Sequence, residues 1–358
     1  MTHCIIVGGG IIGLLQARAL AREGWRVTLL EQGEIGRESS WAGGGILSPL
    51  YPWRYPDAVT QLAVWGQEQY PLLARELIAE GGIDPQWTQS GLLVLDPQEH
   101  AQAHAWAHHW GLPCEELDHR ALLAMIPGLQ LPVSSALWFP TLGQIRNPRL
   151  MKSLFSSGVQ HGVQFSTHTQ VRELLHDDSA VCGMITAQGR LEADRVIIAS
   201  GAWSAQVLKD SVDLPVHPVK GQMLQLQGQP GLLTPIVLYQ DHYLIPRRDG
   251  RILVGSTLEE TGFDKQISAT AKQELLGFVR ALLPALAELP VVAHWAGLRP
   301  ASPSGIPYIC QVPGHPQLYV NTGHFRNGVV LAPASVRLLT DLLLQRTPIV
   351  APAPYQLA

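Results

Sequence analysis

The stretch CIIVGGGIIGLLQARALAREGWRVTLLEQG, residues 4–33, decides the fold of this 358-residue chain. Residues 4–7 are a short, continuous apolar run, which is typical of a buried parallel strand. Over residues 11–23 apolar side chains recur at helical spacing, and Gly24 ends the predicted helix. Residues 25–30 predict a second strand, so the stretch predicts a βαβ unit of about 30 residues.

Three glycines lie in the turn between the first strand and the helix, in the pattern Gly8-x-Gly10-x-x-Gly13. Such glycines permit a tight turn, close approach of the backbone to a pyrophosphate and close helix packing, while the helix start offers free N–H groups. Glu31, at the end of the second strand, can accept hydrogen bonds from a ribose diol. The pattern predicts a dinucleotide site and disfavours NADP; a glycine-rich turn without a ligand is the alternative.

Composition narrows the function classes. The chain is 46% hydrophobic with a formal net charge of −4, which permits a large core and two domains but leaves no basic face for nucleic acid. The four cysteines show no pairing pattern, and no apolar run reaches the roughly 20 residues of a membrane-spanning helix. Because the chain begins at a core strand, we expect no signal peptide and a cytoplasmic location. His104, His108 and His109 lie on a predicted helix, and the pair His104 and His108 has the i, i+4 spacing of metal ligands, but a third ligand and an acidic partner are missing nearby, so we expect no metal.

The rest of the chain alternates between two kinds of pattern. The predicted elements are a long helix over 57–80, strands over 91–95 and 136–139, a helix starting at Asn147-Pro148 with asparagine as N-cap, a parallel strand over 196–200, antiparallel strands over 223–227, 236–245 and 251–256 with a hairpin turn at 248–250, a helix over 268–283, a strand over 291–295, a strand over 318–320 and a helix over 328–345.

These segments predict an α/β fold with two domains. A discontinuous Rossmann-like, dinucleotide-binding domain takes residues 1–85, 146–215 and 296–358. It is interrupted twice by an α+β substrate-binding domain with a large antiparallel sheet, residues 86–145 and 216–295. Such an arrangement predicts a ligand pocket at the interface of the domains.

Further glycine-rich loops favour FAD over NAD. A flavin stays bound through turnover and needs several segments along its length, and the loops SSWAGGGI (39–46), VIIASGAWS (196–204) and GHFRNGVVLAP (323–333) could provide them. A helix starting beside Asn327 and Gly328 would stabilise the negative charge of a reduced flavin. Each loop taken alone could also be an ordinary glycine turn.

With these motifs the sequence resembles the amino-acid oxidase family of FAD-dependent flavoproteins, to which D-amino-acid and sarcosine oxidases belong. The resemblance runs nearly end to end, and its most specific motifs are LYQDHYLIPR (238–247), WAGLRP (295–300) and GHFRNG (323–328). It implies a flavin site formed by Gly8, Gly10, Ile11, Ile12, Gly13, Glu31, Gln32, Ser39, Ser40, Gly44, Gly45, Ile46, Val171, Gly201, His324, Phe325, Arg326, Asn327, Gly328, Val329 and Val330. The flavin is expected to be non-covalent, because the segment 296–300 contains no cysteine.

The resemblance also implies the substrate contacts. Arg299 matches the arginine that binds the substrate carboxylate, a task that suits a bidentate guanidinium. Tyr243 and Arg326 match further contacts, His242 lies beside the entrance, and Leu258 is expected to line the pocket. From the residues alone, a solvated surface arginine, a core tyrosine and a loop-capping arginine remain open as alternatives.

The implied reaction is oxidation of a small amino acid at Cα without a side-chain acid or base. Glycine is the first candidate, giving glyoxylate, ammonia and H2O2, or an imine for thiamine thiazole synthesis. The alternatives are sarcosine, a small D-amino acid or proline as substrate, a dehydrogenase that passes electrons to a quinone, and a flavin-binding protein without turnover. We expect an amino acid and O2 as partners, a homo-oligomer, no nucleic acid and no integral membrane segment.

Overall fold

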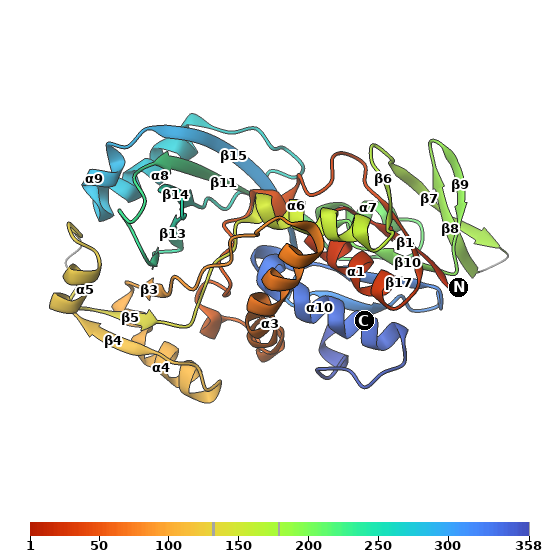
Figure 1. The fold of residues 1–358 in the computed structure, drawn as a ribbon, viewed down its shortest axis with the longest axis horizontal. Helices are drawn as coiled ribbons and strands as arrows, with labels where there is room; N and C mark the ends of the chain where they lie inside the picture. Colours follow the sequence, from red (N-terminus) through yellow and green to blue (C-terminus); the bar gives the residue numbers. More distant parts are fainter. Residues whose placement is uncertain (131–132, 178–179, 358) are drawn as a thin grey trace.

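The computed structural model describes residues 1–130, 133–177 and 180–357. In this part of the chain the strands form sheets of six, eight and three strands. Figure 1 shows the eight-stranded sheet at the left of the molecule and the other two sheets at the right. Parallel and antiparallel sheets therefore occur together, and the predicted α/β class is confirmed.

The six-stranded sheet contains the βαβ unit of residues 4–33. Its strands are, in spatial order, β16 (Tyr308–Gln311), β17 (Leu318–Thr322), β10 (Arg195–Ile198), β1 (His3–Val7), β2 (Arg26–Leu30) and β6 (Gln164–Ser166). All neighbours are parallel except β16 and β17. The predicted strands at 4–7, 25–30, 196–200 and 318–320 are confirmed. Nearly continuous apolar runs form them because both faces of the sheet are covered.

Different layers cover the two faces of this sheet. The helices α1 (Ile11–Arg22), α3 (Asp57–Gly81), α6 (Asn147–Gln160) and α10 (Gly328–Leu343) bury a core against one face. The opposite face packs against α7 (Ser204–Leu208) and the antiparallel sheet of β7 (Val171–Asp177), β8 (Ala180–Thr186) and β9 (Gly189–Glu192). Along β1, Cys4 and Ile6 belong to the first core and Ile5 and Val7 to the second, as the two-residue period of a strand requires.

The eight-stranded sheet carries the second half of the ligand pocket. Its strands are, in spatial order, β15 (Val291–Ala301), β11 (His217–Gln227), β14 (Arg251–Gly255), β13 (His242–Pro246), β12 (Ile236–Tyr239), β3 (Leu92–Val94), β5 (Ser135–Phe139) and β4 (Glu115–Asp118). The helices α5 (His119–Met125), α8 (Ala269–Leu282) and α9 (Pro284–Ala287) cover one face. The other face contacts α4 (His100–His109) and includes Met223, Tyr243 and Ile245.

Short helical turns complete the described secondary structure. They are α2 (Ser39–Ala42), η1 (Pro52–Arg54), η2 (Pro97–Glu99), η3 (Gly201–Trp203), η4 (Phe325–Asn327) and η5 (Ala353–Tyr355).

Two local predictions were wrong, and one predicted strand is longer than expected. Residues 236–245 form the hairpin β12–β13 instead of one strand, because Gln240 and Asp241 adopt φ of 47° and 63° and reverse the chain without a glycine. Asn147 lies inside α6, where Arg146 is the N-cap, and its amide donates instead to Ser40 O at 2.8 Å. The strand expected at 291–295 continues to Ala301 as the edge strand β15, where Pro300 is tolerated.

The segments that form the different sheets alternate along the chain, in the order that the sequence predicts. Residues 3–30, 164–198 and 308–322 supply the six- and three-stranded sheets, and residues 92–139 and 217–301 supply the eight-stranded sheet. The domain boundaries at 85, 145, 215 and 295 stay a prediction, and β15 crosses the last of them.

Candidate functional site

A cavity of about 560 Å³ lies where the two large sheets meet. Its lining includes residues at the carboxyl ends of β1, β2, β10 and β17, the edge at which open α/β sheets bind ligands. The other wall comes from β11, β13 and β15 of the eight-stranded sheet, through Gly221, Met223, Tyr243 and Arg299. The cavity is therefore built jointly by the two sheets.

The glycine-rich turn between β1 and α1 is as tight as the sequence predicts. Gly8 has φ +114°, and a Cβ there would lie 2.4 Å from Ala199 O. A Cβ on Gly13 would lie 1.9 Å from Gly8 O, so the third glycine lets α1 pack on the turn. Gly10, the N-cap of α1, lines the cavity, and the first turn of the helix carries no acidic side chain. The positive end of the helix dipole therefore faces a space that suits an anion.

Glu31 follows β2 and lines the same cavity. Its Oε2 accepts a hydrogen bond from Gly9 N–H at 2.7 Å, and its Oε1 accepts one from Gly33 N–H at 2.9 Å. Each carboxylate oxygen has a further lone pair, so this fixed carboxylate can still accept hydrogen bonds from two hydroxyl groups.

Arg247 holds the loop at residues 43–46 and was missed by the sequence analysis. Its guanidinium is buried and donates to Gly44 O at 2.7 Å, to Ile145 O at 3.1 Å and to the Gln144 side chain at 2.6 Å. Burial lowers the pKa of Arg247 to about 9. Its place in the polar turn RRDG gave no sign of burial, because this composition is typical of an exposed hairpin turn.

The Arg299 guanidinium lies over a glycine of the neighbouring strand. Its side chain crosses β11 above Gly221, where a Cβ would lie 2.1 Å from Nη2. Gly221 pairs with Gly297 of β15 in the sheet register. Nη1 donates to Lys220 O at 3.2 Å and Thr257 O at 3.1 Å, and Nη2 donates to Ser256 Oγ at 2.7 Å.

The charge of Arg299 has no acidic partner among the described residues. Every hydrogen-bond acceptor found for it is neutral, and burial lowers its pKa to about 10. The ring of Tyr243 lies nearby, opposite Gly255, where a Cβ would be 2.5 Å from the ring. A guanidinium that opens to a cavity without a counter-ion is suited to bind a carboxylate.

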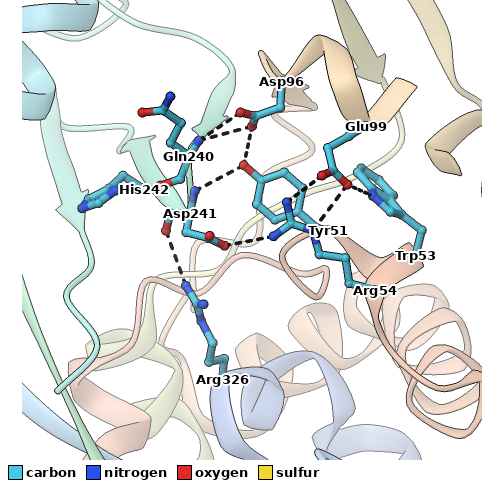
Figure 2. A network of polar contacts seen from close by, with 9 residues as sticks. All are labelled: Tyr51, Trp53, Arg54, Asp96, Glu99, Gln240, Asp241, His242 and Arg326. Atoms are coloured by element: carbon cyan, nitrogen blue, oxygen red, sulfur yellow. Dashed lines mark hydrogen bonds and ion pairs between the residues drawn. The ribbon is translucent and has the colours of Figure 1, made fainter. Parts of the chain in front are cut away.

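A polar network borders the cavity at Arg326 (Figure 2). Arg326 Nη2 lies 3.5 Å from the carbonyl oxygen of Asp241, in the β12–β13 turn. The Asp241 carboxylate contacts Arg54 at 3.4 Å, and Arg54 pairs with Glu99 at 2.8 Å. Tyr51 donates to Asp96, whose carboxylate also accepts from the Gln240 N–H. The network fixes the turn that faces Arg326.

The structure brings most of the predicted site residues to this one cavity. Those that line it are Gly8, Gly10, Ile11, Ile12, Glu31, Gln32, Ser39, Ser40, Gly44, Gly45, Ile46, Val171, Gly201, Tyr243, Arg299, His324, Phe325, Arg326, Gly328 and Val329. Gly13, Asn327 and Val330 do not line the cavity, and all three are buried.

Two predicted substrate contacts lie elsewhere. His242 lines a separate cavity of about 260 Å³ beside α8, where it contacts Glu274 at 3.2 Å and stacks on Phe278. Leu258 is 53% exposed and does not line the main cavity, although its neighbours Ser256 and Thr257 hold Arg299.

Other kinds of site can be surveyed in the part of the chain that the structure describes. It contains no group of three histidine, cysteine or acidic side chains able to hold a metal ion, and no helix there combines the length and apolarity needed to cross a membrane. The cysteines Cys4, Cys114, Cys182 and Cys310 are free, and none lines the main cavity.

The residues present fit a bound FAD. The tight turn and the start of α1 suit a pyrophosphate, and Glu31 suits a ribose. At the β17 end, Asn321 is 1% exposed and lines the cavity, yet its Oδ1 has no hydrogen-bond partner among the described residues. A buried amide oxygen of this kind favours a ligand that donates a hydrogen bond.

The fold and the cavity are those of a dinucleotide-binding protein in which the guanidinium of Arg299, without an acidic partner among the described residues, lines the same cavity. The family model described as DAO, FAD dependent oxidoreductase, matches residues 3–342. The chain belongs to this family, so the predicted family and its FAD dependence are confirmed.

Individual relatives agree with this assignment. The chain is 50% identical over 353 residues to the glycine oxidase of Pseudomonas aeruginosa, covering 98% of this chain and 97% of the relative. It is 31% identical to the bifunctional protein ThiO/ThiG of a Synechocystis species, covering 96% of this chain and 51% of that protein. The crystal structure of glycine oxidase from Geobacillus kaustophilus superposes with a TM-score of 0.93, at 30% identity, covering 100% of this chain and 99% of that one.

Proposed function

We propose that this protein oxidises glycine, with water and O2, to glyoxylate, ammonia and H2O2. The observation that carries the proposal is the guanidinium of Arg299, which opens to the cavity without an acidic partner among the described residues. A carboxylate would neutralise it and could accept two parallel hydrogen bonds. Similarity to proteins named glycine oxidase supports glycine over sarcosine, D-amino acids and proline.

Different segments of the chain would hold different parts of the cofactor. The turn at Gly8–Ile12 would hold the pyrophosphate and Glu31 the ribose, while the 44–46 loop and residues 324–329 would close on the ring end. FAD, when bound, supplies the two-electron oxidation of the Cα–H bond and returns the electrons to O2. Arg299 and Tyr243 would orient the substrate so that its Cα faces the ring, and orientation alone can lower a barrier by roughly 7–11 kcal/mol in favourable cases.

No side chain is needed as a general acid or base. The acidic side chains that line the cavity are already engaged: Glu31 binds two backbone N–H groups, and Glu38 pairs with Lys265 at 2.8 Å. Burial lowers the pKa of His324 to about 3, so its imidazole is neutral at physiological pH. The nitrogen lone pair of a neutral substrate amine would therefore stabilise the cation that develops as hydride leaves Cα.

We also propose that FAD is held without a covalent bond, because none of the described cysteines lines the cavity.

We further propose that the imine product serves thiamine thiazole synthesis, which the relative named ThiO/ThiG supports. We propose in addition that the protein is cytoplasmic and assembles as a homo-oligomer.

The test uses the purified, FAD-loaded protein. Glycine added without air should bleach the flavin spectrum, and air should restore it with formation of glyoxylate and H2O2. Arg299→Ala should raise the KM for glycine by at least about 100-fold while FAD stays bound, because the carboxylate clamp is lost. Arg280→Ala, which removes an exposed arginine of α8, is the matched control and should change neither value.

Two results would contradict the proposal. If glycine leaves the flavin oxidised while sarcosine, D-alanine or D-proline bleaches it, the substrate is a different amine. If Arg299→Ala leaves KM unchanged, the carboxylate binds elsewhere.

A further inference from the structure

The hydrogen-bond acceptors that orient the Arg299 guanidinium come from two separate segments. Lys220 O belongs to β11, whereas Ser256 Oγ and Thr257 O follow the end of β14. The direction of the guanidinium therefore depends on how the segment 256–259 is fixed against β11.

One residue, Glu259, joins these segments through its backbone. Lys220 N–H donates to Glu259 O at 2.9 Å, and Glu259 N–H donates to Lys220 O at 2.9 Å. The oxygen of Lys220 that accepts from Glu259 is the same oxygen that accepts from Arg299.

The carboxylate of Glu259 joins the same segments a second time. Its Oε2 pairs with Lys220 Nζ at 3.0 Å, where the lysine side chain is 5% exposed. Its Oε1 accepts from Thr257 Oγ1 at 2.5 Å and from Gln222 Nε2 at 2.8 Å. The Thr257 hydroxyl also accepts from Gln222 N–H at 2.9 Å, so the contacts form a closed network.

The network keeps Glu259 ionised. Burial opposes ionisation, but the hydrogen bonds from Thr257, Lys220 and Gln222 hold the pKa of Glu259 below its usual value. A neutral side chain at this position would leave the nearly buried Lys220 ammonium with one acidic partner among the described residues, Asp264 at 3.5 Å, beside the carbonyl oxygen of Gln266 at 3.2 Å.

We propose that Glu259 is a positioning residue for substrate binding: it fixes the segment 256–259 on β11 and thereby aims Arg299 at the substrate carboxylate. The inference rests on the proposed role of Arg299 as the carboxylate clamp. Glu259 does not line the cavity, so it acts through Lys220 and Thr257. Because a guanidinium binds a carboxylate bidentately only in a narrow geometry, a loosened segment weakens binding more than it slows the chemical step.

The experiment compares Glu259→Gln with Glu260→Gln, which removes the charge of the exposed neighbouring acid. Four quantities are measured on the FAD-loaded proteins: KM and kcat for glycine, the dissociation constant of acetate from the flavin absorbance, and FAD content after gel filtration. Glu259→Gln should raise KM and the acetate dissociation constant about 10-fold, with kcat and FAD content retained. Glu260→Gln should match the wild type.

A second variant guards against a folding defect. Thr257→Val removes one hydroxyl of the network but keeps the backbone acceptor of Arg299, and it should weaken acetate binding in the same direction as Glu259→Gln. If Glu259→Gln does not fold and Thr257→Val binds acetate like the wild type, the positioning role is wrong.

Arg299→Lys separates the two proposals. If Arg299→Lys weakens acetate binding but Glu259→Gln does not, only the positioning role fails. If Arg299→Lys leaves acetate binding unchanged, the carboxylate clamp fails and the positioning role fails with it.

Discussion

At the scale of single residues, two glycines leave the space that the side chains of Arg299 and a neighbour fill in the cavity wall. Gly221 and Gly255 leave the space that the Arg299 guanidinium and the Tyr243 ring occupy. Neither glycine has a left-handed backbone, so their role is space and not conformational freedom.

Gly221→Ala tests this use of space. The new Cβ would lie 2.1 Å from Arg299 Nη2, so the guanidinium must move away. We expect the KM for glycine to rise about 10-fold with FAD still bound, measured by steady-state kinetics and the flavin spectrum. Gly277→Ala, where a Cβ meets no atom within 4 Å, is the control. An unchanged KM in Gly221→Ala would show that the guanidinium has room to relax.

His324 predicts a pH dependence of stability. It is 2% exposed and contacts Ser335 Oγ at 3.0 Å, and burial lowers its pKa to about 3. In the unfolded chain a histidine titrates near pH 6.5, so between these values the unfolded state binds the extra proton. The stabilisation is complete above about pH 6.5 and falls as the pH drops, by up to about 3 kcal/mol at pH 4.

Urea unfolding of the wild type and His324→Gln at pH 7, 6, 5 and 4 measures this contribution, at a fixed FAD concentration. The difference between their free energies of unfolding should narrow or reverse in favour of the variant as the pH falls. Other groups titrate in both proteins and cancel. Parallel curves would mean that His324 binds a proton equally well in the folded and the unfolded protein.

At the scale of elements, a side chain of α3 supplies a hydrogen bond that the first turn of α10 lacks. Pro333 has no N–H, so the carbonyl of Val329 lacks its helical donor. The hydroxyl of Tyr70, on α3, donates to that carbonyl at 2.5 Å, and Val329 lines the cavity. Gly66 permits this contact, because a Cβ there would lie 2.1 Å from Val330 O.

Tyr70→Phe should therefore destabilise the fold by about 1–3 kcal/mol, since it leaves the partly buried Val329 carbonyl without this donor. We expect a lower midpoint of thermal unfolding and faster loss of FAD on dilution. Tyr319→Phe is the control, because the Tyr319 hydroxyl makes no hydrogen bond within the described residues. Equal midpoints for the two variants would assign the Val329 carbonyl another donor.

Elements with strong periodicity could be predicted from the sequence. The buried runs of β1, β2, β10 and β17 and the amphipathic α8 carry their own signals. The β12–β13 turn could not be predicted, because Gln240 and Asp241 take left-handed conformations that favour glycine or asparagine.

The residues of the site divide in the same way, into those that a local sequence pattern predicts and those whose role depends on tertiary contacts. The glycine turn and Glu31 are set by a local pattern, whereas Arg247 and Glu259 matter only through contacts with Gly44 and Lys220, far away in the sequence. A single sequence does not contain such tertiary pairings. His242 was expected beside the entrance from resemblance alone; it contacts Glu274 of α8 and is not among the residues that line the main cavity.

At the scale of the whole molecule, the order of strands in the six-stranded sheet sets when the protein can finish folding during synthesis. β1 lies between β2 and β10, β10 pairs with β17, and α1 packs against α10. At roughly 5–20 residues per second, a ribosome needs on the order of 15–60 s between making β1 and making β17. The apolar faces of β1 and α1 stay incompletely covered during that time.

The cavity also forms late in synthesis, because it is lined both by residues 8–12 and by residues 321–329. A nascent chain has no complete cofactor cavity until residues 321–329 have emerged from the ribosome. FAD can therefore be enclosed on all sides only after residues 321–329 have been made, more than 300 residues after the glycine-rich turn.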